Sequence, residues 1–367
     1  MDETNLRIDA DFPGGNIVVE GVQGEAVMVR ADLRDTEGDW FYWCFRITGA
    51  AGRRLQILFT AGNPVGVRGP ALSVDGGPWS WLGPGVLIPR GFHVDVPATA
   101  REVRLGMTIP YVQTDLEAFL ARQPELTRGV LTRSRAGREV ELLRLPAQGV
   151  LRQRVLLTAR HHCCEAMASF VLEGLLTAAA RDEALRAHTE LVAVPLVDKD
   201  GVERGDQGKS RRPRDHNRDY DERPIYPEVR ALKALAAGWT DAPVAVALDL
   251  HCPYISGTNN EHIYFVGGPE AAMWERVQAF ARRLEALRRG PLPYAVKGSV
   301  PFGTSWNTAA NYRGGQSCTR WATSLPGIHF ASSLEIPYAN ASGAEVNPAS
   351  ARAFGADLAA ALSAELT

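Results

Sequence analysis

The first 110 residues alternate apolar and polar positions over short runs, which is the pattern of β-strands with one buried face. The alternation is clearest at 27–33, 92–96 and 103–109. Turns rich in glycine and proline, such as 62–64 and 76–78, separate these runs. We therefore predict an all-β sandwich domain over residues 1–112.

Two short elements are predicted after this region. Thr114 and Glu117 have the spacing of a capping box, in which two side chains satisfy backbone N–H groups at the start of a helix. The runs 130–133 and 139–145 flank Ala136-Gly137, a sequence that favours a hairpin turn. We expect a short helix followed by a hairpin.

From residue 153 onward, short apolar runs alternate with longer stretches of helical periodicity. The predicted strands are 154–158, 190–197, 244–251, a run near 262–266 and a run near 328–336. The predicted helices are 165–181, 226–238, 269–288 and 349–365. This order predicts an α/β domain over 113–367, with a mixed, largely parallel sheet covered by helices on both faces.

Composition and charge narrow the function classes. The chain has 367 residues, 45% of them hydrophobic, and a formal net charge of −2, so nothing in its overall charge favours nucleic acid or an anionic membrane as a partner. No apolar run approaches the roughly 18 residues of a membrane span, and the acidic N-terminus lacks the pattern of a secretory signal. The five cysteines are scattered, which argues against a disulfide framework. We expect a cytoplasmic protein, and no pattern indicates an oligomeric state.

Candidate metal ligands lie where two predicted strands end. His162 and Glu165 follow the strand 154–158, and His251 ends the strand 244–251. Functional groups gather at the carboxyl ends of strands in open α/β sheets, so these three side chains can converge. Two histidines and a glutamate form a known catalytic zinc set that leaves the fourth position for water. Each residue alone is more often a surface histidine or a paired carboxylate.

Two further features suit hydrolysis near such a metal. The polar, basic segment 202–220 contains Asn217-Arg218, a pair suited to binding a carboxylate. Its basic density is also compatible with a nucleic-acid patch or a solvated loop, but no aromatic stacking platform accompanies it. Glu335 stands in an apolar strand, where a carboxylate suits a general base unless that strand faces solvent.

The chain resembles the zinc carboxypeptidases, and more narrowly the cytosolic carboxypeptidase-like branch, in its bacterial form with an N-terminal β-sandwich domain. The matching segments are ARHHCCE, VPLVDKDGVERG, DHNRDY, LDLHC and SLEIPY, in the family's order from residue 159 to 338. Trp40-Phe41-Tyr42 and Pro110-Tyr111 resemble the sandwich domain of that branch. The resemblance therefore covers nearly the whole chain.

The resemblance implies a role for each matching residue. His162, Glu165 and His251 would hold one Zn²⁺ per chain, and Glu335 would be the general base. Asn217 and Arg218 would bind the terminal carboxylate of the substrate, Asp215 would accept a hydrogen bond from His162, and Tyr312 would be the active-site tyrosine, although a packing aromatic fits that position equally well.

This chain departs from the family pattern near the implied zinc site. Cys163-Cys164 replaces the usual Pro-Gly, as small buried fillers or as oxidation-sensitive groups near the metal, and we favour fillers. The family's oxyanion arginine falls on Gly208, so Lys209 or Arg211 must replace it, with Arg211 preferred. The family also has a cis peptide after the last ligand histidine, which predicts that Cys252–Pro253 is cis.

The implied reaction is removal of C-terminal residues from a peptide or protein. Arg320 adjoins the position of the family's side-chain pocket and would select acidic ends. The alternative enzyme is an N-acyl amino acid amidohydrolase of the aspartoacylase and succinylglutamate desuccinylase type, which shares the zinc set. A further alternative is a pseudoenzyme that holds a peptide tail without cleaving it.

Overall fold

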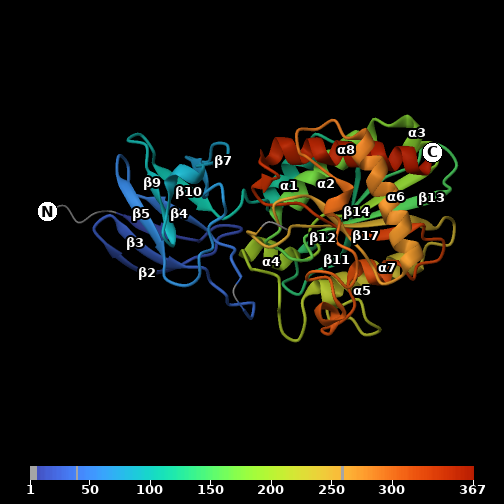
Figure 1. Ribbon diagram of the computed structural model, residues 1–367, viewed down its shortest axis with the longest axis horizontal. Coiled ribbons are helices and arrows are strands. Elements are labelled where there is room, and N and C mark those ends of the chain that lie inside the picture. Colours follow the sequence, from blue (N-terminus) through green and yellow to red (C-terminus); the bar gives the residue numbers. More distant parts are fainter. Residues whose placement is uncertain (1–5, 39, 258–259) are drawn as a thin grey trace.

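The computed structural model describes residues 6–38, 40–257 and 260–367. Residues 7–106 form two five-stranded sheets (Figure 1). The first sheet has the order β1 (Arg7–Asp9), β4 (Cys44–Thr48), β10 (Glu102–Gly106), β6 (Ala71–Val74) and β7 (Ser80–Trp81). The second has the order β2 (Val18–Gln23), β3 (Ala26–Arg30), β5 (Arg54–Phe59), β9 (Gly91–Asp95) and β8 (Leu87–Ile88). The three runs with the clearest alternation are β3, β9 and β10.

The helix predicted from a capping box at Thr114 begins two residues earlier, and Asp115 instead of Glu117 makes the contact with the N-cap backbone. Helix α1 (Gln113–Leu120) starts after Val112, whose backbone N–H donates to the carboxylate of Asp115 at 2.8 Å. Thr114 therefore lies inside the first turn and does not cap it. The predicted hairpin is formed by β11 (Thr127–Arg133) and β12 (Glu139–Leu145).

A seven-stranded mixed sheet occupies the rest of the chain. Its order is β11, β12, β14 (Thr189–Val194), β13 (Gln153–Ala159), β15 (Val244–His251), β17 (Phe330–Glu335) and β16 (Tyr264–Val266). The pairs β14–β13, β13–β15 and β15–β17 are parallel, and the three pairs nearer the edges are antiparallel. The sheet is thus parallel in its centre rather than through most of its width, because the strands toward both edges run antiparallel to their neighbours.

Helices pack on both faces of this sheet, as Figure 1 shows. The helices are α2 (Ala166–Ala180), α3 (Glu183–Arg186), α4 (Lys199–Arg204), α5 (Pro227–Ala237), α6 (Ala271–Leu287), α7 (Cys318–Ala322) and α8 (Pro348–Leu366). Short 3₁₀ turns lie at 84–86, 216–218, 296–298 and 309–312, and a two-stranded ribbon joins β18 (Asn340–Ala341) to β19 (Ala344–Glu345). No described helix is long and apolar enough to cross a membrane.

The strands that carry the candidate ligands are buried on both faces, which is why they are almost continuously apolar. In β15, Val246 and Leu248 pack on the side of α2, α6 and α8, whereas Val244 and Ala247 pack on the side of α5 and α7. All eight residues of β15 are buried. This double burial fixes the register of the central strands, since a shift by one residue would exchange the two packed faces.

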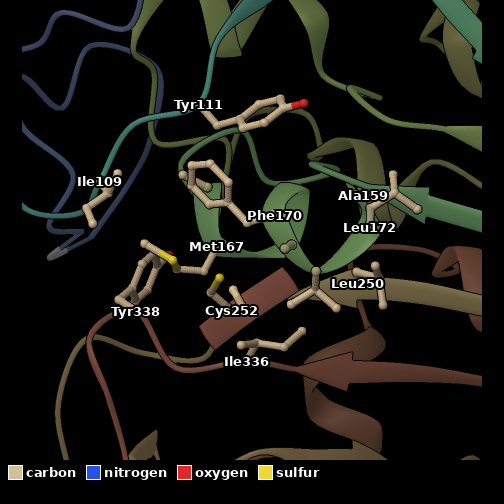
Figure 2. Packing of buried hydrophobic residues seen from close by; sticks show 14 of the residues in the cluster. Ile109, Tyr111, Ala159, Met167, Phe170, Leu172, Leu250, Cys252, Ile336 and Tyr338 are labelled. Carbon is tan, nitrogen blue, oxygen red and sulfur yellow. The ribbon is translucent and has the colours of Figure 1, made fainter. Parts of the chain in front are cut away.

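The N-terminal sheets share a continuous apolar core with the α/β region. Figure 2 shows Ile109 and Tyr111, which lie between β10 and α1, next to Met167 and Phe170 of α2. The rings of Tyr111 and Phe170 meet edge to face at 5.1 Å, and those of Phe41 and Tyr338 at 5.7 Å. Such aromatic contacts add to the free energy gained by burying the surfaces. The two regions are therefore packed against each other next to the candidate site.

Candidate metal centre

The carboxyl ends of three central strands meet at one edge of the sheet, where the chemistry-bearing residues lie. Strand β13 ends at Ala159, just before the histidine pair, and β15 ends at His251. The parallel register of β15 and β17 places His251 beside Glu335, the last residue of its strand. Strand register alone thus brings the predicted base next to a predicted ligand.

The turn after β13 is held by an unusual arginine. Arg160 has a φ of 64°, in the left-handed region that residues with a side chain seldom adopt. Its buried guanidinium donates to the backbone carbonyls of Tyr111 and Cys163, both at 2.9 Å, and to Ser169 Oγ at 3.1 Å. These bonds offset the backbone strain, so the chain reverses sharply into His161-His162.

The three predicted ligands converge. His162 Nδ1 lies 3.0 Å from Glu165 Oε1, and His251 Nδ1 lies 2.7 Å from Glu165 Oε2. One ligand atom from each residue can be chosen so that all three lie within 4.8 Å of one another. Glu165 is the N-cap residue of α2, a position where the helix dipole favours negative charge. The residues therefore fit a single metal ion held by two imidazoles and a carboxylate.

A cation from the 202–220 segment also reaches this carboxylate. Lys209 Nζ lies 2.6 Å from Glu165 Oε1, and its side chain is 12% exposed. Burial alone would favour neutral Lys209, but the charge of Glu165 outweighs it and raises the pKa of the ammonium. Burial likewise opposes the ionisation of Glu165, yet Lys209, His162 and His251 together lower its pKa well below the usual range. Both groups are charged at neutral pH.

A buried chain of polar contacts orients His251 from behind. Asp249 Oδ2 lies 2.6 Å from His251 Nε2, and the other oxygen, Oδ1, lies 2.8 Å from His161 Nδ1 and accepts from Thr158 Oγ1 at 2.8 Å. His161 Nε2 in turn faces the hydroxyl of Tyr220 at 2.7 Å. A carboxylate behind a ligand histidine fixes its ring orientation. Residues 249 and 251 are two positions apart in β15, so their side chains point to the same face. This spacing is the feature of the sequence from which their contact could have been predicted.

His161, Asp249 and Cys318 form a second group of residue types that bind metals. Both ring nitrogens of His161 are already occupied, by Asp249 and by Tyr220. Through Asp249, this group is hydrogen-bonded to His251 and supports its ring.

The predicted contact between Asp215 and His162 is longer than expected. Asp215 Oδ1 lies 3.8 Å from His162 Nε2, which exceeds a hydrogen-bond distance. Burial opposes the ionisation of Asp215, but His162 and the charge of Arg218 outweigh it and lower the pKa of the carboxyl. Asp215 therefore faces His162 as an anion without a hydrogen bond to it. Behind the other ligand histidine, Asp249 does lie within hydrogen-bond distance of His251.

Glu335 is buried beside the converging ligands. It is 8% exposed, and its Oε2 atom has no hydrogen-bond partner among the described residues. Burial is the largest influence on its carboxyl group and raises the pKa. An unpartnered buried carboxylate is costly unless a ligand satisfies it, so this oxygen suits a water molecule or a substrate group.

A cavity of about 380 Å³ contains most of the predicted site residues. Its wall includes His162, Lys209, Asp215, Asn217, Arg218, His251, Tyr312 and Glu335. Aromatic side chains from distant parts of the chain complete it: Trp40, Tyr254, Tyr264 and Trp306. Trp40 comes from the N-terminal region, so the cavity is not formed by the α/β region alone.

The Asn217-Arg218 pair enters the cavity with its polar groups partly engaged. Arg218 donates from Nε to the carbonyl of Asn311 at 3.0 Å and from Nη1 to that of Asn217 at 2.8 Å. These bonds fix the plane of its guanidinium. The amide of Asn217 lies between His251 Nε2, at 3.1 Å, and the backbone N–H of Cys318, which donates to its oxygen at 2.9 Å.

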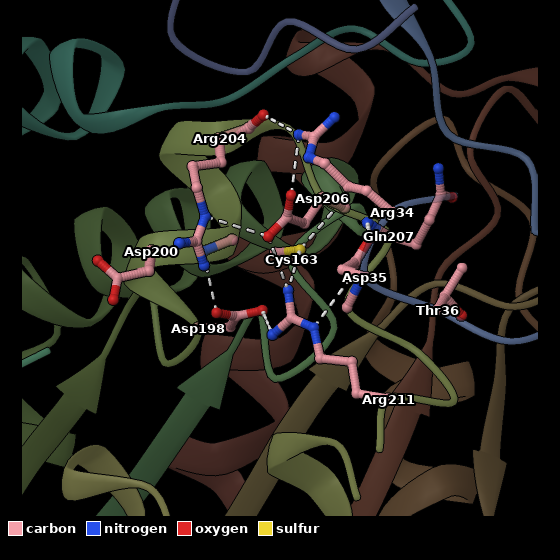
Figure 3. A network of polar contacts seen from close by, with 12 residues as sticks. Arg34, Asp35, Thr36, Cys163, Asp198, Asp200, Arg204, Asp206, Gln207 and Arg211 are labelled. Carbon is pink, nitrogen blue, oxygen red and sulfur yellow. Dashed lines mark hydrogen bonds and ion pairs between the residues drawn. The ribbon is translucent and has the colours of Figure 1, made fainter. Parts of the chain in front are cut away.

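Arg211, the preferred oxyanion cation, does not reach the cavity. Figure 3 shows its guanidinium among the carboxylates of Asp35, Asp198 and Asp206. Its nitrogens lie 2.9 Å from Asp35, 2.5 Å from Asp198 and 3.2 Å from Asp206. The prediction is corrected: charge pairing draws Arg211 away from the metal centre, and Lys209 is the cation there.

Tyr312 and Arg320 lie together at one end of the site. The guanidinium carbon atoms of Arg218 and Arg320 lie 5.2 and 5.0 Å from the centre of the Tyr312 ring. The Tyr312 hydroxyl donates to Asn307 Oδ1 at 2.9 Å. Arg320 lines a small adjoining cavity that it shares with Tyr312, and it does not line the main one.

The two cysteines between the ligands are both 2% exposed. Burial raises the pKa of Cys164 to about 12, so it is a neutral thiol, and burial also raises that of Cys163. A Cβ atom added at Gly208 would lie 2.4 Å from the backbone nitrogen of Cys163, and one at Gly201 would lie 2.6 Å from its sulfur. Cys163 thus fills a tightly packed position.

The predicted cis peptide at Cys252–Pro253 is wrong. The described cis peptide bond is Arg212–Pro213, and Cys252–Pro253 is trans. The trans isomer is the lower in energy for an X-Pro bond, and the close contact of His251 with Glu165 is made without the cis form.

No protein-family model and no curated protein sequence matches the chain, but solved structures share its fold. A metallo-carboxypeptidase from Burkholderia cenocepacia has a TM-score of 0.78 at 21% identity, covering 97% of each chain. A metallo-carboxypeptidase from Pseudomonas aeruginosa in complex with (2-guanidinoethylmercapto)succinic acid has a TM-score of 0.75 at 20% identity, covering 98% of each chain. A carboxypeptidase A from Helicoverpa armigera has a TM-score of 0.51 at 14% identity and covers 70% of this chain and 74% of its own. The chain therefore has the fold of metallo-carboxypeptidases.

Proposed function

We propose that this protein is a zinc-dependent metallocarboxypeptidase that removes C-terminal residues from peptides or proteins. One observation supports the proposal above the others. The ligand atoms of His162, Glu165 and His251 lie within 4.8 Å of one another, and the two histidines line the cavity that also holds Glu335, whose Oε2 has no hydrogen-bond partner among the described residues. The wall of that cavity includes Arg218, a group suited to a substrate carboxylate.

The donor set favours zinc. Two imidazoles and one carboxylate are a known catalytic zinc set with an open fourth position, and calcium or magnesium would be bound mainly by oxygen atoms. When bound, zinc lowers the pKa of a coordinated water toward about 7 and polarises a carbonyl group. Two contacts hold the ligands in place before the metal binds: that of Asp249 with His251, and that of Arg160 with the backbone carbonyl of Cys163 in the turn that bears His162.

Residues of the chain provide proton transfer, stabilisation of negative charge and substrate binding. Glu335 accepts a proton from the attacking water and delivers it to the leaving amine, since its carboxylate lies beside His251 and burial raises its pKa, which makes it a stronger base. The ammonium of Lys209 faces the centre and stabilises negative charge that develops on the carbonyl oxygen. Arg218 binds the terminal carboxylate of the substrate, and the side-chain amide of Asn217 lies beside it, 3.1 Å from His251 Nε2.

Substitution of the base tests the reaction. In Glu335→Gln, we expect kcat to fall by about 10²- to 10⁴-fold, because the amide cannot accept the proton. Zinc content, measured by elemental analysis of the purified protein, should stay at that of the wild type. Glu275→Gln, at an exposed position on α6, is the matched control and should keep full activity. Near-normal turnover by Glu335→Gln would refute the assignment.

A substrate panel tests the class of substrate. We propose a preference for acidic C-terminal residues, since Arg218 and Arg320 flank the ring at the end of the cavity and would disfavour a cationic side chain there. Peptides ending in Glu, Lys and Phe should be compared by kcat/KM, with Glu expected to be highest and Arg320→Ala to reduce the difference. A preference for Lys would exclude acidic selectivity. Faster cleavage of N-acyl amino acids than of any peptide would favour the amidohydrolase alternative.

A further inference from the structure

A segment of the N-terminal region is hydrogen-bonded to the loop that bears Lys209. Residues 34–38 and 40–42 run along residues 205–211, which lie about 170 positions later in the sequence. The contacts involve both the backbone and the side chains of the loop, and Figure 3 shows Asp35, Thr36, Gln207 and Arg211 in this region.

Asp35 makes the most concentrated contact. Its Oδ1 accepts the backbone N–H of Gln207 at 2.9 Å, and its Oδ2 accepts that of Gly208 at 2.9 Å and Nε of Arg211 at 2.9 Å. One carboxylate thus bonds the chain on both sides of Lys209. Its side chain is 11% exposed, so these charge-assisted bonds are largely shielded from water.

Residues next to Asp35 make further contacts with the same loop. The Thr36 hydroxyl donates to the carbonyl of Lys209, and the backbone N–H of Glu37 donates to that of Ser210 at 3.2 Å. Lys209 Nζ lies 5.1 Å from the centre of the Trp40 ring, within the range of a cation–π contact. The side chain of Lys209 is therefore held at its base by hydrogen bonds and near its tip by an aromatic face.

The other side of the loop is closed by close packing. Gly208 has a φ of 79°, and an added Cβ atom would lie 2.4 Å from the backbone nitrogen of Cys163. The loop therefore lies between Asp35 and the turn that carries His162. This contact blocks a displacement of Gly208 toward Cys163. If the bonds to Asp35 are lost, the loop can therefore move only away from the candidate metal centre.

We propose that Asp35 is a positioning residue for the reaction, which acts through the backbone at 207–211 to hold the Lys209 ammonium in the catalytic cavity. The inference rests on the proposed function of Lys209 toward the substrate carbonyl. A lysine side chain is flexible, and ordering it costs rotamer entropy. Fixing its backbone from a separate part of the chain keeps its donor where negative charge develops, and small misplacements of such a donor reduce rates strongly.

The first experiment compares Asp35→Ala and Asp35→Asn with Glu37→Gln. We expect kcat to fall at least tenfold in Asp35→Ala and less in Asp35→Asn, which keeps one acceptor oxygen, with KM changing little. Arg211 retains Asp198 and Asp206 in both variants, so its charge stays paired and the fold should persist. Glu37 pairs with the exposed Arg212, and its replacement should leave kcat unchanged. Unchanged kcat in Asp35→Ala would overturn the proposal.

A double-mutant cycle separates positioning from general loss of structure. If Asp35 acts through Lys209, then Asp35→Ala should lower kcat less than twofold in a Lys209→Ala background. Effects that multiply would show that Asp35 acts elsewhere and would overturn the proposal. Should Asp35→Ala fail to fold, Thr36→Val, which removes the bond to the Lys209 carbonyl, can take its place in the cycle.

A second readout does not depend on turnover. Trace acetylation of the purified protein, followed by mass spectrometry, reports the accessibility of Lys209 against the exposed Lys297 as an internal reference. We expect Lys209 to be labelled at least fivefold more in Asp35→Ala than in the wild type or Glu37→Gln, and equal labelling would overturn the positioning role. Wild-type protein that cleaves no substrate would refute the proposed function, yet this labelling ratio would still decide whether Asp35 positions Lys209.

Discussion

The candidate metal centre is assembled in two different ways on its two sides. On one side, His162, His251 and Glu335 stand at or just after the ends of adjacent parallel strands, and their separation follows from strand register. On the other side, Lys209 and Arg218 come from the loop between α4 and α5, whose path is set by contacts with a distant part of the chain. The strand side is buried on both faces of a sheet, whereas the loop side is fixed by charges.

The difference shows where a sequence pattern determines position. A residue in a doubly buried strand cannot shift without exposing one face, so its neighbours in the sheet are determined with it. A residue in a loop goes where its charge is best paired. Lys209 and Arg211 are two positions apart, yet Lys209 pairs with Glu165 and Arg211 pairs with Asp35, Asp198 and Asp206.

Replacing each of these two cations by methionine sharpens the comparison. For Lys209→Met, we expect kcat to fall about 10²-fold or more, because one donor to the developing oxyanion is lost. Its Tm should change little, since the bound metal still compensates the charge of Glu165. For Arg211→Met, we expect the larger loss of stability, about 3 kcal/mol or more, because three carboxylates lose their shared partner. Kinetics at 25 °C and thermal unfolding of the zinc-loaded proteins measure both effects.

Arg212→Met is the matched control, since Arg212 is 81% exposed and pairs only with the carboxylate of Glu37 among the described residues. It should alter neither quantity measurably. If Arg211→Met lost more kcat than Lys209→Met while both proteins remained folded, the assignment of Lys209 to the centre would be wrong.

The sequence predicted the positions on the strand side and failed mainly on the loop side. Helical and strand periodicity placed the sheet strands within a few residues, and it overstated only the share of parallel pairs. Arg211 is the wrong choice between the two cations because the carboxylate of Asp35, which pairs with it, lies 176 positions away and has no local signal in the sequence. Similarly, the resemblance predicts a hydrogen bond between Asp215 and His162, but the two groups lie 3.8 Å apart, and the short carboxylate contact behind a ligand histidine is that of Asp249 with His251. Contacts between distant segments were the information that local patterns lacked.

Acid should reduce the difference in Tm between wild type and Arg211→Met. This is the smallest of the effects that we expect. Burial opposes the ionisation of Asp198, but the charge of Arg211 outweighs it and lowers the pKa of the carboxyl. A depressed pKa adds stability above the unfolded-state value of about 3.9, and this contribution is lost as pH falls through the lower folded value. Burial raises the pKa of Asp206, which partly offsets the trend. The Tm difference should therefore be largest near pH 7 and smaller below about pH 4. A difference independent of pH would show that Arg211 stabilises the loop by packing and not by its charge.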